Sequence, residues 1–484
     1  MNSESLNQAK SRFLDGIKFF NEKNYELAEK NFLESLKLAP QRISVIGNLI
    51  KIYVVTKQIK KLSEILAKYK KLNNEKEILF GKAYNFFFNE NFDESIKICN
   101  QIINNKDIKY PIQDLLASNF KNKGNFLQTL KIYKNKLLEN KKDYKVYYNI
   151  GCLLLEIGKN LQAIFYFKKS KKLNQNNPDI NWRLSLCFLA VENFKDGFIL
   201  YEDRWKRENH PVKKFKEIKL PTHISEIKNK KVLVWDEQGL GDTLQFSRFV
   251  IDLIKYTDQI TFVVNKKLKG ILSNLNTNIL VKDYEDLNKL DFDFQIPICS
   301  LPKYLSISKK EDFNFYKLKL PEIKNKYELK EKEKLSIGIT WSGNPNYLMD
   351  KYRSISFEKI KQLLKIKDIN FYQLSKNIKQ TEFIDYNSYK NLIDIGNKSL
   401  FEIASMLKEL DLVISSDTSI IHLAGILEIK SILLLSYNAD WRWFNDNKNT
   451  IWYPSVEIIR QKKFNVWDDV FENLLEKIQK KRAV

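Results

Sequence analysis

Residues 16–40 have the sequence GIKFFNEKNYELAEKNFLESLKLAP. Small side chains stand here at fixed offsets from an aromatic one: Gly16, Ala28 and Ser35 are small, Phe32 is aromatic, and Pro40 closes the stretch. Small residues let two helices approach closely, and an aromatic ring can fill the gap between neighbouring helix pairs. The stretch therefore predicts a pair of packed helices that is one unit of a larger array.

The same offsets return later in the chain, at Gly151, Ala163, Phe167 and Ser170. The period is near the roughly 34 residues of a tetratricopeptide helix pair. Weaker copies surround the asparagine-aromatic pairs Asn91-Phe92, Asn125-Phe126 and Asn193-Phe194, whereas residues 49–71 fit poorly. An amphipathic bundle would share the helical periodicity, but the fixed small-residue offsets favour a solenoid. We predict a tetratricopeptide-type α-solenoid over residues 1–210 that docks a peptide or partner protein.

After residue 210, short apolar runs alternate with helical patterns. The runs are KVLVW, QITFVV, FQIPI, LSIGITW, INFYQL, LDLVISS and SILLLS. Strands separated by helices predict parallel sheets covered on both faces. A Lys- and Glu-rich stretch at 319–334 divides the region in two. The expected fold class is α + α/β, with doubly wound Rossmann-like domains at 211–330 and 331–484, the second ending in a helix.

The first candidate site follows the expected strand 232–235, where the loop DEQGLGD (236–242) runs into a helix. A glycine-rich turn before a helix directs backbone N–H groups and the helix dipole toward a cleft. We expect the cleft to be lined by Glu237, Gln238, Gly239 and Gly241. Asp242 has two interpretations: an isolated Asp at this position usually caps the helix, whereas at a cleft it can act as a general base.

The second candidate site follows the expected strand at 335–341. The turn Ser342-Gly343-Asn344-Pro345 precedes the basic run DKYRS (350–354). A loop that carries Lys and Arg directly after a strand is placed to stabilise a departing diphosphate. Gly343, Asn344 and Arg353 are therefore candidates for donor binding, although an Arg in so basic a protein is often only solvated.

The third candidate site has the sequence LVISSDTSIIHLAG (412–425). A buried strand that ends in hydroxyl side chains and an Asp, just before a helix, gathers free N–H groups at one point. This predicts a pyrophosphate cradle at Asp417, Thr418 and Ser419. His422 follows within the helix, where a lone histidine is more often a core residue than a ligand contact.

A tract rich in Trp covers residues 440–444 (DWRWF) and 451–454 (IWYP). Core packing explains most of such a tract, because buried Trp side chains bring large apolar areas into the interior. The alternative is an exposed ring on which a base or sugar stacks.

Composition excludes several classes of function. The 82 Lys and Arg against 59 Asp and Glu give a formal charge of +23, but the lysines are spread along the chain, so we expect no specific nucleic-acid site. The four cysteines lack disulfide or zinc spacing, and no metal or other cofactor is expected. No segment has the apolar length of a signal peptide or a transmembrane helix, which predicts a cytoplasmic protein.

Five motifs behind the repeats carry a family resemblance. They are WDEQGLGDTLQFSRF (235–249), ITWSGNP (339–345), DKYRSI (350–355), LDLVISSDTSIIHLAG (410–425) and NADWRWF (438–444). In this order they resemble the repeat-containing bacterial relatives of the ADP-heptose heptosyltransferase family, which is glycosyltransferase family 9-like. Lys351-Tyr352 stands where these relatives more usually have Arg-Asn, and Ser416 and Ser419 also depart from the usual residues.

The resemblance implies a GT-B fold and an inverting, metal-independent glycosyltransferase of hexosyl- or heptosyltransferase type. Asp242 matches the proposed general base, Arg353 the contact to the donor phosphates, and Asp417, Thr418 and His422 the donor-binding motif. The donor would be a nucleotide sugar, and the acceptor would be a protein or glycan that the repeats could hold. The alternative is a non-catalytic repeat scaffold or adaptor with a degenerate nucleotide-binding domain.

Overall fold

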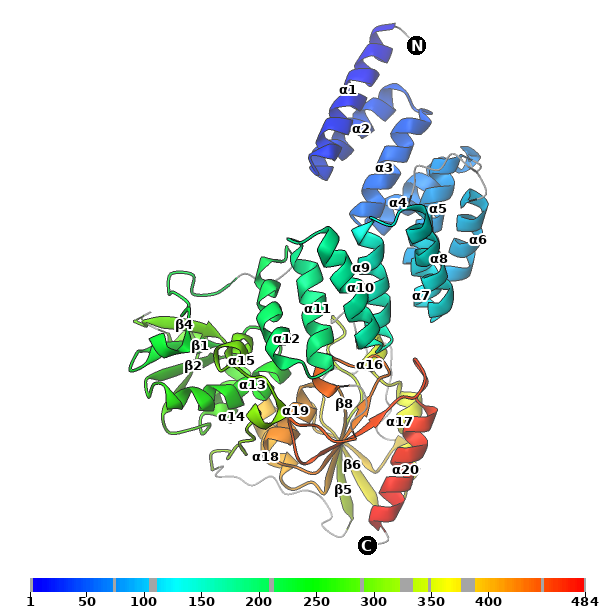
Figure 1. The fold of residues 1–484 in the computed structure, drawn as a ribbon. Helices are drawn as coiled ribbons and strands as arrows, with labels where there is room; N and C mark the ends of the chain where they lie inside the picture. Colours follow the sequence, from blue (N-terminus) through cyan, green and yellow to red (C-terminus); the bar gives the residue numbers. More distant parts are fainter. Residues whose placement is uncertain are drawn as a thin grey trace. The chain divides into compact units, whose positions relative to one another are not determined.

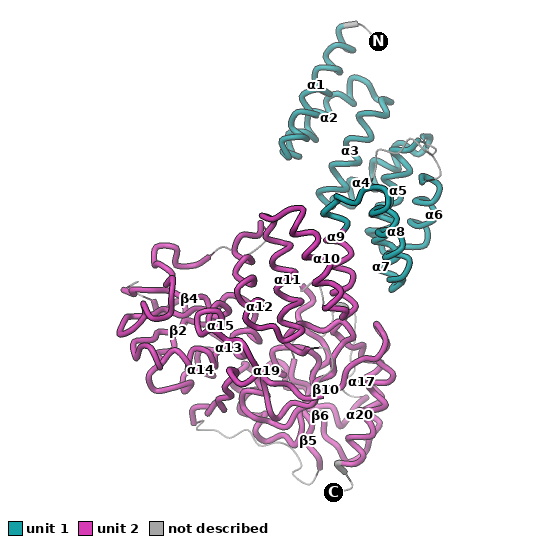
Figure 2. The backbone as a smooth tube through the Cα atoms, viewed as in Figure 1, with its two compact units in different colours: residues 1–146 teal, residues 147–484 magenta. Residues whose placement is uncertain are grey.

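The structure is a computed structural model that describes residues 3–72, 75–103, 111–208, 213–287, 291–322, 334–346, 350–375, 388–444 and 448–482. The chain forms two compact units, residues 1–146 and 147–484 (Figure 2). The last two helix pairs thus belong to the same compact unit as the sheets. The domain boundaries at residues 210 and 330 stay predictions, and residues 323–333 of the expected linker lie outside the described residues.

The first unit is built from helix pairs (Figure 1). The pairs are α1 (Ser3–Asn21) with α2 (Tyr25–Leu38), α3 (Ile43–Val55) with α4 (Ile59–Lys68), α5 (Lys76–Phe88) with α6 (Phe92–Ile103), and α7 (Ile112–Asn122) with α8 (Phe126–Glu139). The poorly fitting stretch 49–71 is therefore helical as well. Its α3 keeps a buried glycine, Gly47, but the repeat offsets from it fall on Ile59, Ser63 and Leu66 of α4 instead of a small, an aromatic and a small residue, which explains the weak repeat signal.

The turn inside each helix pair has a recurring backbone geometry. Lys23, Glu90, Gly124 and Glu192 all have φ between 58° and 75°, and each precedes an asparagine. That asparagine caps the second helix: the Oδ1 of Asn125 accepts a hydrogen bond from the N–H of Gln128 at 3.2 Å. The asparagine-aromatic pairs of the sequence are thus helix N-caps, which satisfy a backbone donor at the start of the helix.

The small residues of the repeat allow close packing inside a pair. A Cβ atom on Gly16 would lie 2.6 Å from the ring of Phe32, and one on Gly151 would lie 2.7 Å from the ring of Phe167. The aromatic ring therefore packs against the glycine of its own pair, whereas the sequence predicted that it fills the gap between pairs. The reason is that each ring needs a neighbour without a side chain.

Hydroxyl side chains add a second contact inside three of the pairs. The Oγ of Ser35 donates to the carbonyl of Ala9 at 2.7 Å, and the Oγ of Ser95 donates to that of Ala83 at 2.8 Å. Thr129 makes the same contact with Ala117 at 3.2 Å. These small polar residues are fully buried and join the second helix to the first.

The second unit begins with two further helix pairs and continues into a four-stranded sheet (Figure 1). The helices are α9 (Tyr144–Glu156), whose first residues belong to the other unit, α10 (Asn160–Leu173), α11 (Pro178–Ala190) and α12 (Phe194–Tyr201), followed by a 3-10 turn at Glu202–Lys206. The strands are β1 (Val232–Trp235), β2 (Ile260–Val264), β3 (Ile279–Asp283) and β4 (Phe294–Pro297). They are all parallel, in the order β3-β2-β1-β4, with α13 (Leu240–Asp252), α14 (Lys266–Leu272) and α15 (Leu301–Tyr304) between or after them.

The second sheet has six parallel strands in the order β10-β9-β8-β5-β6-β7. They are β5 (Leu335–Thr340), β6 (Ile369–Gln373), β7 (Leu392–Asp394), β8 (Leu412–Ser416), β9 (Ser431–Leu435) and β10 (Val456–Arg460). The helices are α16 (Asp350–Arg353), α17 (Phe357–Leu364), α18 (Leu400–Leu407), α19 (Ser419–Ile426) and the C-terminal α20 (Asp468–Arg482). The α + α/β class with parallel sheets is confirmed.

In both sheets, the strand that comes first in the sequence lies inside the sheet. The chain adds the next strands on one side of it and then adds the later strands on its other side. The direction reverses between β1 and β4 in one sheet and between β5 and β8 in the other. Ligands of doubly wound sheets bind at the carboxyl ends of strands at such a switch point. One hydrophobic core joins both sheets: α13 packs on α19, and a Cβ on Gly241 would lie 2.7 Å from the His422 ring.

Two helical glycines give a matched test of the close packing. Gly151→Ala places a methyl group against Phe167 and should lower the free energy of unfolding by about 1–3 kcal/mol. Gly270→Ala, in α14, meets only Phe401 at 3.4 Å and should leave the free energy of unfolding unchanged or raise it by up to about 1 kcal/mol. Denaturant unfolding of both variants measures the difference, and equal effects would contradict the packing described here.

Candidate functional site

The switch point of the six-stranded sheet contains buried hydroxyl groups without partners. Thr340 ends β5 and Ser416 ends β8, and their side chains are 1% and 0% exposed. Neither Oγ atom has a hydrogen-bond partner among the described residues. Buried polar groups nearly always have a hydrogen-bond partner. Two unsatisfied hydroxyls at the carboxyl ends of neighbouring strands therefore mark a place suited to a ligand.

Arg353 connects the second and third candidate sites. Its Nη1 donates to the backbone carbonyl of Asp417 at 2.7 Å, and its Nε donates to Asp350 at 3.0 Å. The other Asp350 oxygen accepts from Ser354, whose Oγ in turn accepts from the N–H of Gly343 at 3.2 Å. Gly343, Arg353 and Asp417 are thus brought together. Asn344 is not, because it lies in an exposed turn where its Oδ1 accepts from the N–H of Asn346.

The residues predicted to form a pyrophosphate cradle lie at the start of α19. Thr418 caps the helix through the N–H of Ile420 and lies 3.2 Å from the Oγ of Ser415, while Ser419 is the first helical residue and is partly exposed. Burial and the nearby carboxylate of Asp440 raise the pKa of Asp417 to about 6. The cradle therefore holds a carboxylate that can change charge near neutral pH.

His422 lies deeper in the same helix. Burial and the nearby Arg442, Arg353 and Arg248 lower the pKa of His422 to about 3, so the ring is neutral at physiological pH. Its Nε2 lies 3.9 Å from Asp417, its Nδ1 is hydrogen-bonded to the Tyr453 hydroxyl at 2.9 Å, and its ring stacks on Trp443. His422 is thus a packed core residue that also borders the cradle.

Asp242, at the start of α13, uses both carboxylate oxygens. Its Oδ2 accepts a hydrogen bond from the N–H of Gly239 at 2.9 Å, which is the helix-capping contact expected from the sequence. Its Oδ1 lies 2.6 Å from the Nη2 of Arg442. The capping interpretation is therefore realised, and the ion pair places Asp242 beside the cradle of the second sheet.

The loop before Asp242 is fixed by the last helix pair. Glu237 is fully covered, and its two oxygens accept from the Nε and Nη2 of Arg204 at 3.0 and 2.9 Å. Arg204 also pairs with Glu202 and donates to Ser300, and its side chain is 1% exposed. Gln238 donates to the Tyr201 hydroxyl. The carboxylate of Glu237 thus serves a buried ion pair, whereas Gln238 and Gly239 are exposed at the loop surface.

Sequence reasoning missed Arg442, which lies between two tryptophans in a 3-10 turn at Trp441–Trp443. The side chains of Trp441, Trp443, Trp452 and Tyr453 are buried, so core packing explains the aromatic tract. Arg442 is also buried and pairs with Asp242 and Asp440. An Arg inside an apolar tract predicts that a carboxylate lies nearby in the fold, because a buried Arg needs such a partner. The sequence does not reveal which carboxylate this is, since the partner Asp242 is 200 residues away.

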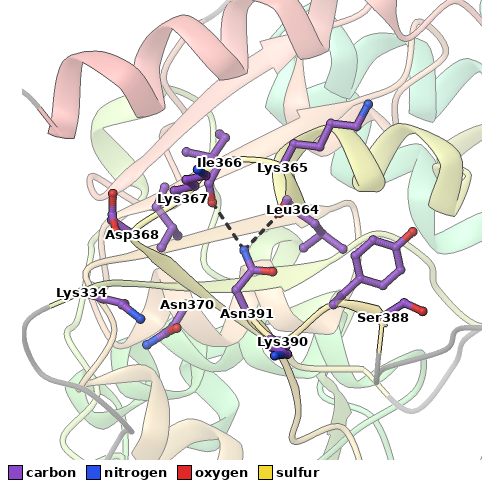
Figure 3. Close-up of a pocket in the computed structure, with 12 residues that line it drawn as sticks. Lys334, Leu364, Lys365, Ile366, Lys367, Asp368, Asn370, Ser388, Lys390 and Asn391 are labelled. Carbon is purple, nitrogen blue, oxygen red and sulfur yellow. Dashed lines mark hydrogen bonds between the residues drawn. The ribbon is translucent and has the colours of Figure 1, made fainter.

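A pocket of about 530 Å³ lies elsewhere in the second unit. It is lined by the residues that precede β5, β6 and β7 and by the end of α17, including four lysines: Lys334, Lys365, Lys367 and Lys390 (Figure 3). Asn391 donates to the carbonyls of Leu364 and Ile366 and so closes the end of α17. The pocket contains none of the predicted site residues, which lie at the carboxyl ends of the strands.

Comparison with known proteins identifies one segment. The tetratricopeptide repeat family model matches residues 144–177, which cover α9, α10 and the turn after them. Residues 144–177 are a tetratricopeptide repeat. This confirms the prediction made from Gly151, Ala163, Phe167 and Ser170, while no curated protein matches the chain.

Solved structures with some likeness include tetratricopeptide repeat proteins and pilus-biogenesis proteins. Pseudomonas aeruginosa PilF is 12% identical over 42% of this chain and 93% of its own, with a TM-score of 0.33. PilW, a type IV pilus biogenesis factor, is 16% identical over 43% of this chain and 93% of its own, with a TM-score of 0.37. A tetratricopeptide repeat protein from Parabacteroides merdae is 17% identical over 36% of this chain and 68% of its own, with a TM-score of 0.32.

Two classes of feature are absent from the described part of the chain. No group of three or more His, Cys, Asp or Glu side chains among the described residues is arranged to hold a metal ion. Within the same ranges, no helix is long and apolar enough to span a bilayer. Among the four cysteines, Cys99, Cys187 and Cys299 are buried and Cys152 is partly buried.

The protonation of His422 can be measured directly. We expect no titration of its ring between pH 5 and 8, because its pKa is lowered from 6.5 to about 3. The unfolded chain protonates this histidine below about pH 6.5, so the group removes stability as the pH falls from that value toward 3. NMR of histidine-labelled protein, with His422→Gln to assign the signal, tests this; a midpoint above pH 5 would contradict it.

The buried pair of Arg204 and Glu237 can be tested by removing one partner. Arg204→Met leaves the covered Glu237 carboxylate without its cation and should cost about 3–5 kcal/mol of unfolding free energy. The double variant Arg204→Met/Glu237→Gln should recover a large part of that loss. Lys206→Met is the control, because Lys206 forms an exposed pair with Asp203 and should change stability by less than about 1 kcal/mol. Equal losses in the three variants would contradict the assignment.

Proposed function

We propose that this protein is a glycosyltransferase that moves a sugar from a nucleotide-sugar donor to a protein or glycan acceptor, with inversion and without a metal ion. One observation carries the proposal. At the switch point of the six-stranded sheet, Arg353 is bonded to the Asp417 carbonyl at the start of α19. The strands that end here carry the Thr340 and Ser416 hydroxyls, which have no partner among the described residues. A diphosphate suits this place, because a cation, hydroxyl groups and a helix N-terminus meet at the carboxyl ends of the strands.

In the proposed reaction, the acceptor oxygen forms a bond to the anomeric carbon as the bond from that carbon to the diphosphate oxygen breaks. Asp242 accepts the proton of the acceptor hydroxyl. Arg353, the Thr418 hydroxyl and the N-terminus of α19 stabilise the negative charge on the departing nucleoside diphosphate. The contact between α13 and α19 supports this assignment, because it brings Asp242 close to the donor cradle.

The helical repeats suggest how an acceptor would be held. Tetratricopeptide-type helix pairs stack into solenoids with an extended concave surface, which commonly binds peptides or folded partners. Residues 144–177 are such a repeat. The first helix pair shares its glycine-aromatic packing, and the turns inside the preceding pairs share its positive φ. We therefore propose a protein or protein-linked glycan acceptor that docks on the repeats.

A second candidate function is a non-catalytic adaptor, and one observation favours it. Both oxygens of Asp242 are used, one by the N–H of Gly239 and one by Arg442. An acceptor hydroxyl would have to compete with both of these contacts for the carboxylate. The adaptor would bind a partner through its repeats, with nucleotide binding but no sugar transfer.

Titration calorimetry at physiological salt with ADP-, UDP-, GDP- and CMP-linked sugars tests the donor site. We expect one nucleotide to be preferred, and Arg353→Ala to weaken its binding about tenfold or more, because a charged hydrogen bond contributes about 1.5–3 kcal/mol. Arg207→Ala, whose ion pair with Asp179 lies among the helices, is the control. Binding without turnover would favour the adaptor, and no binding to any nucleotide sugar would exclude the transferase.

A further inference from the structure

We infer that Arg442 is a second diphosphate-binding residue and that Asp242 is the counter-ion with which the diphosphate competes. This inference rests on the proposed function, since it names a residue of the same donor site. It also changes how Asp242 would work, because its carboxylate would be released for proton transfer only when the donor replaces it on Arg442.

The first observation is that the Arg442 guanidinium is buried but incompletely satisfied. Its side chain is 9% exposed. Nη1 donates to Asp440 at 2.8 Å. Among the described residues, Nε and Nη2 have no hydrogen bond of good geometry, although Nη2 lies 2.6 Å from Asp242. A guanidinium has five N–H donors, and leaving a buried one unsatisfied costs free energy. The group is therefore suited to a further anionic partner.

The second observation is that Arg442 is held in one orientation. Its guanidinium lies 4.8 Å from the centre of the Trp441 ring and 5.6 Å from that of Phe246, a residue of α13. Asp440 binds both its Nη1 and its backbone N–H. A cation fixed in this way loses little side-chain entropy when it binds a ligand, which favours recognition of a planar, bidentate partner such as phosphate.

The third observation is that Arg442 and Arg353 act on the same place. Both guanidinium groups act to lower the pKa of Asp417, and both contribute to the lowered pKa of His422. Arg353 reaches the start of α19 from the end of α16, while Arg442 lies in the segment after β9. Two cations that both act on the residue before this helix match the two phosphate groups of a nucleoside diphosphate better than a single anionic group.

The competition follows from the shared N–H groups. Phosphate oxygens would bind the Nε and Nη2 groups of Arg442, and the Asp242 carboxylate already contacts Nη2. A bidentate phosphate contact is strong enough to compete with it. When a diphosphate takes that side, the Oδ1 of Asp242 becomes free, while its Oδ2 still accepts from the N–H of Gly239. Donor binding would thus precede activation of the acceptor hydroxyl.

The test is calorimetric titration of the full chain with ADP, UDP, GDP, CDP and inorganic pyrophosphate at physiological salt. We expect Arg442→Lys to weaken binding of the preferred probe about tenfold or more, because an ammonium lacks the bidentate fork. Asp242→Asn should tighten binding at least about threefold, because it removes the competing charge and keeps a side-chain oxygen for the helix cap.

Two matched controls should leave the affinity unchanged. Asp252→Asn removes a buried carboxylate from the same helix, α13, where it binds Asn314 and Tyr316 away from the cradle. Arg207→Lys makes the same exchange of guanidinium for ammonium in the helical region. Together they separate a local effect on the site from a general effect of charge.

The outcomes separate this inference from the proposed function. If the wild-type protein binds none of the probes, the donor site itself fails. If Arg353→Ala weakens binding but Asp242→Asn leaves it unchanged or weakens it, the donor site stands and the inference about Arg442 is overturned. Should Arg442→Lys not fold, Asp242→Asn decides alone, since only tighter binding agrees with competition for the guanidinium.

Discussion

The N–H groups of a buried guanidinium need hydrogen-bond acceptors, and this requirement fixes how the elements of the 147–484 unit meet. Arg204, after α12, reaches Glu237 beyond β1. Arg248, in α13, donates to the carbonyl of Trp452 beyond β9 at 2.6 Å. Arg442 reaches back to Asp242 at the start of α13. Each bond joins distant parts of the sequence. Together they connect the helices and both sheets near the carboxyl ends of the strands, where ligands of such folds bind.

The sequence predicts the interior of this fold better than its edges. Seven strands are continuous apolar runs, because their neighbours cover them on both faces, and all seven are present. The strands β3, β7 and β10 were not predicted; each lies at a sheet edge and has partly exposed residues, which interrupt the apolar pattern. The repeat was found from glycine and aromatic offsets, whereas α3 and α4 were obscured because α4 carries other residue types at those offsets.

In the candidate site, too, the sequence predicts only what a local pattern contains. Strand-turn-helix patterns predicted Asp242, Arg353 and Asp417, because each follows a strand in the local sequence, and the structure brings these three close to one another through Arg442 and the start of α19. Asn344 follows the same local pattern but lies in an exposed turn. The role of Glu237 and that of Arg442 depend on partners 33 and 200 residues away, which no local pattern contains.

The bond between Arg204 and Glu237 limits how this protein can recombine during evolution. Helices up to residue 146 form their own compact unit, so repeats there can be duplicated, lost or exchanged to change partners. The last helix pair cannot be exchanged in the same way, because a replacement lacking Arg204 would leave a carboxylate buried beneath the loop that starts α13. The α/β half is thus inherited together with its final repeat, and partner diversity is expected to arise upstream of it.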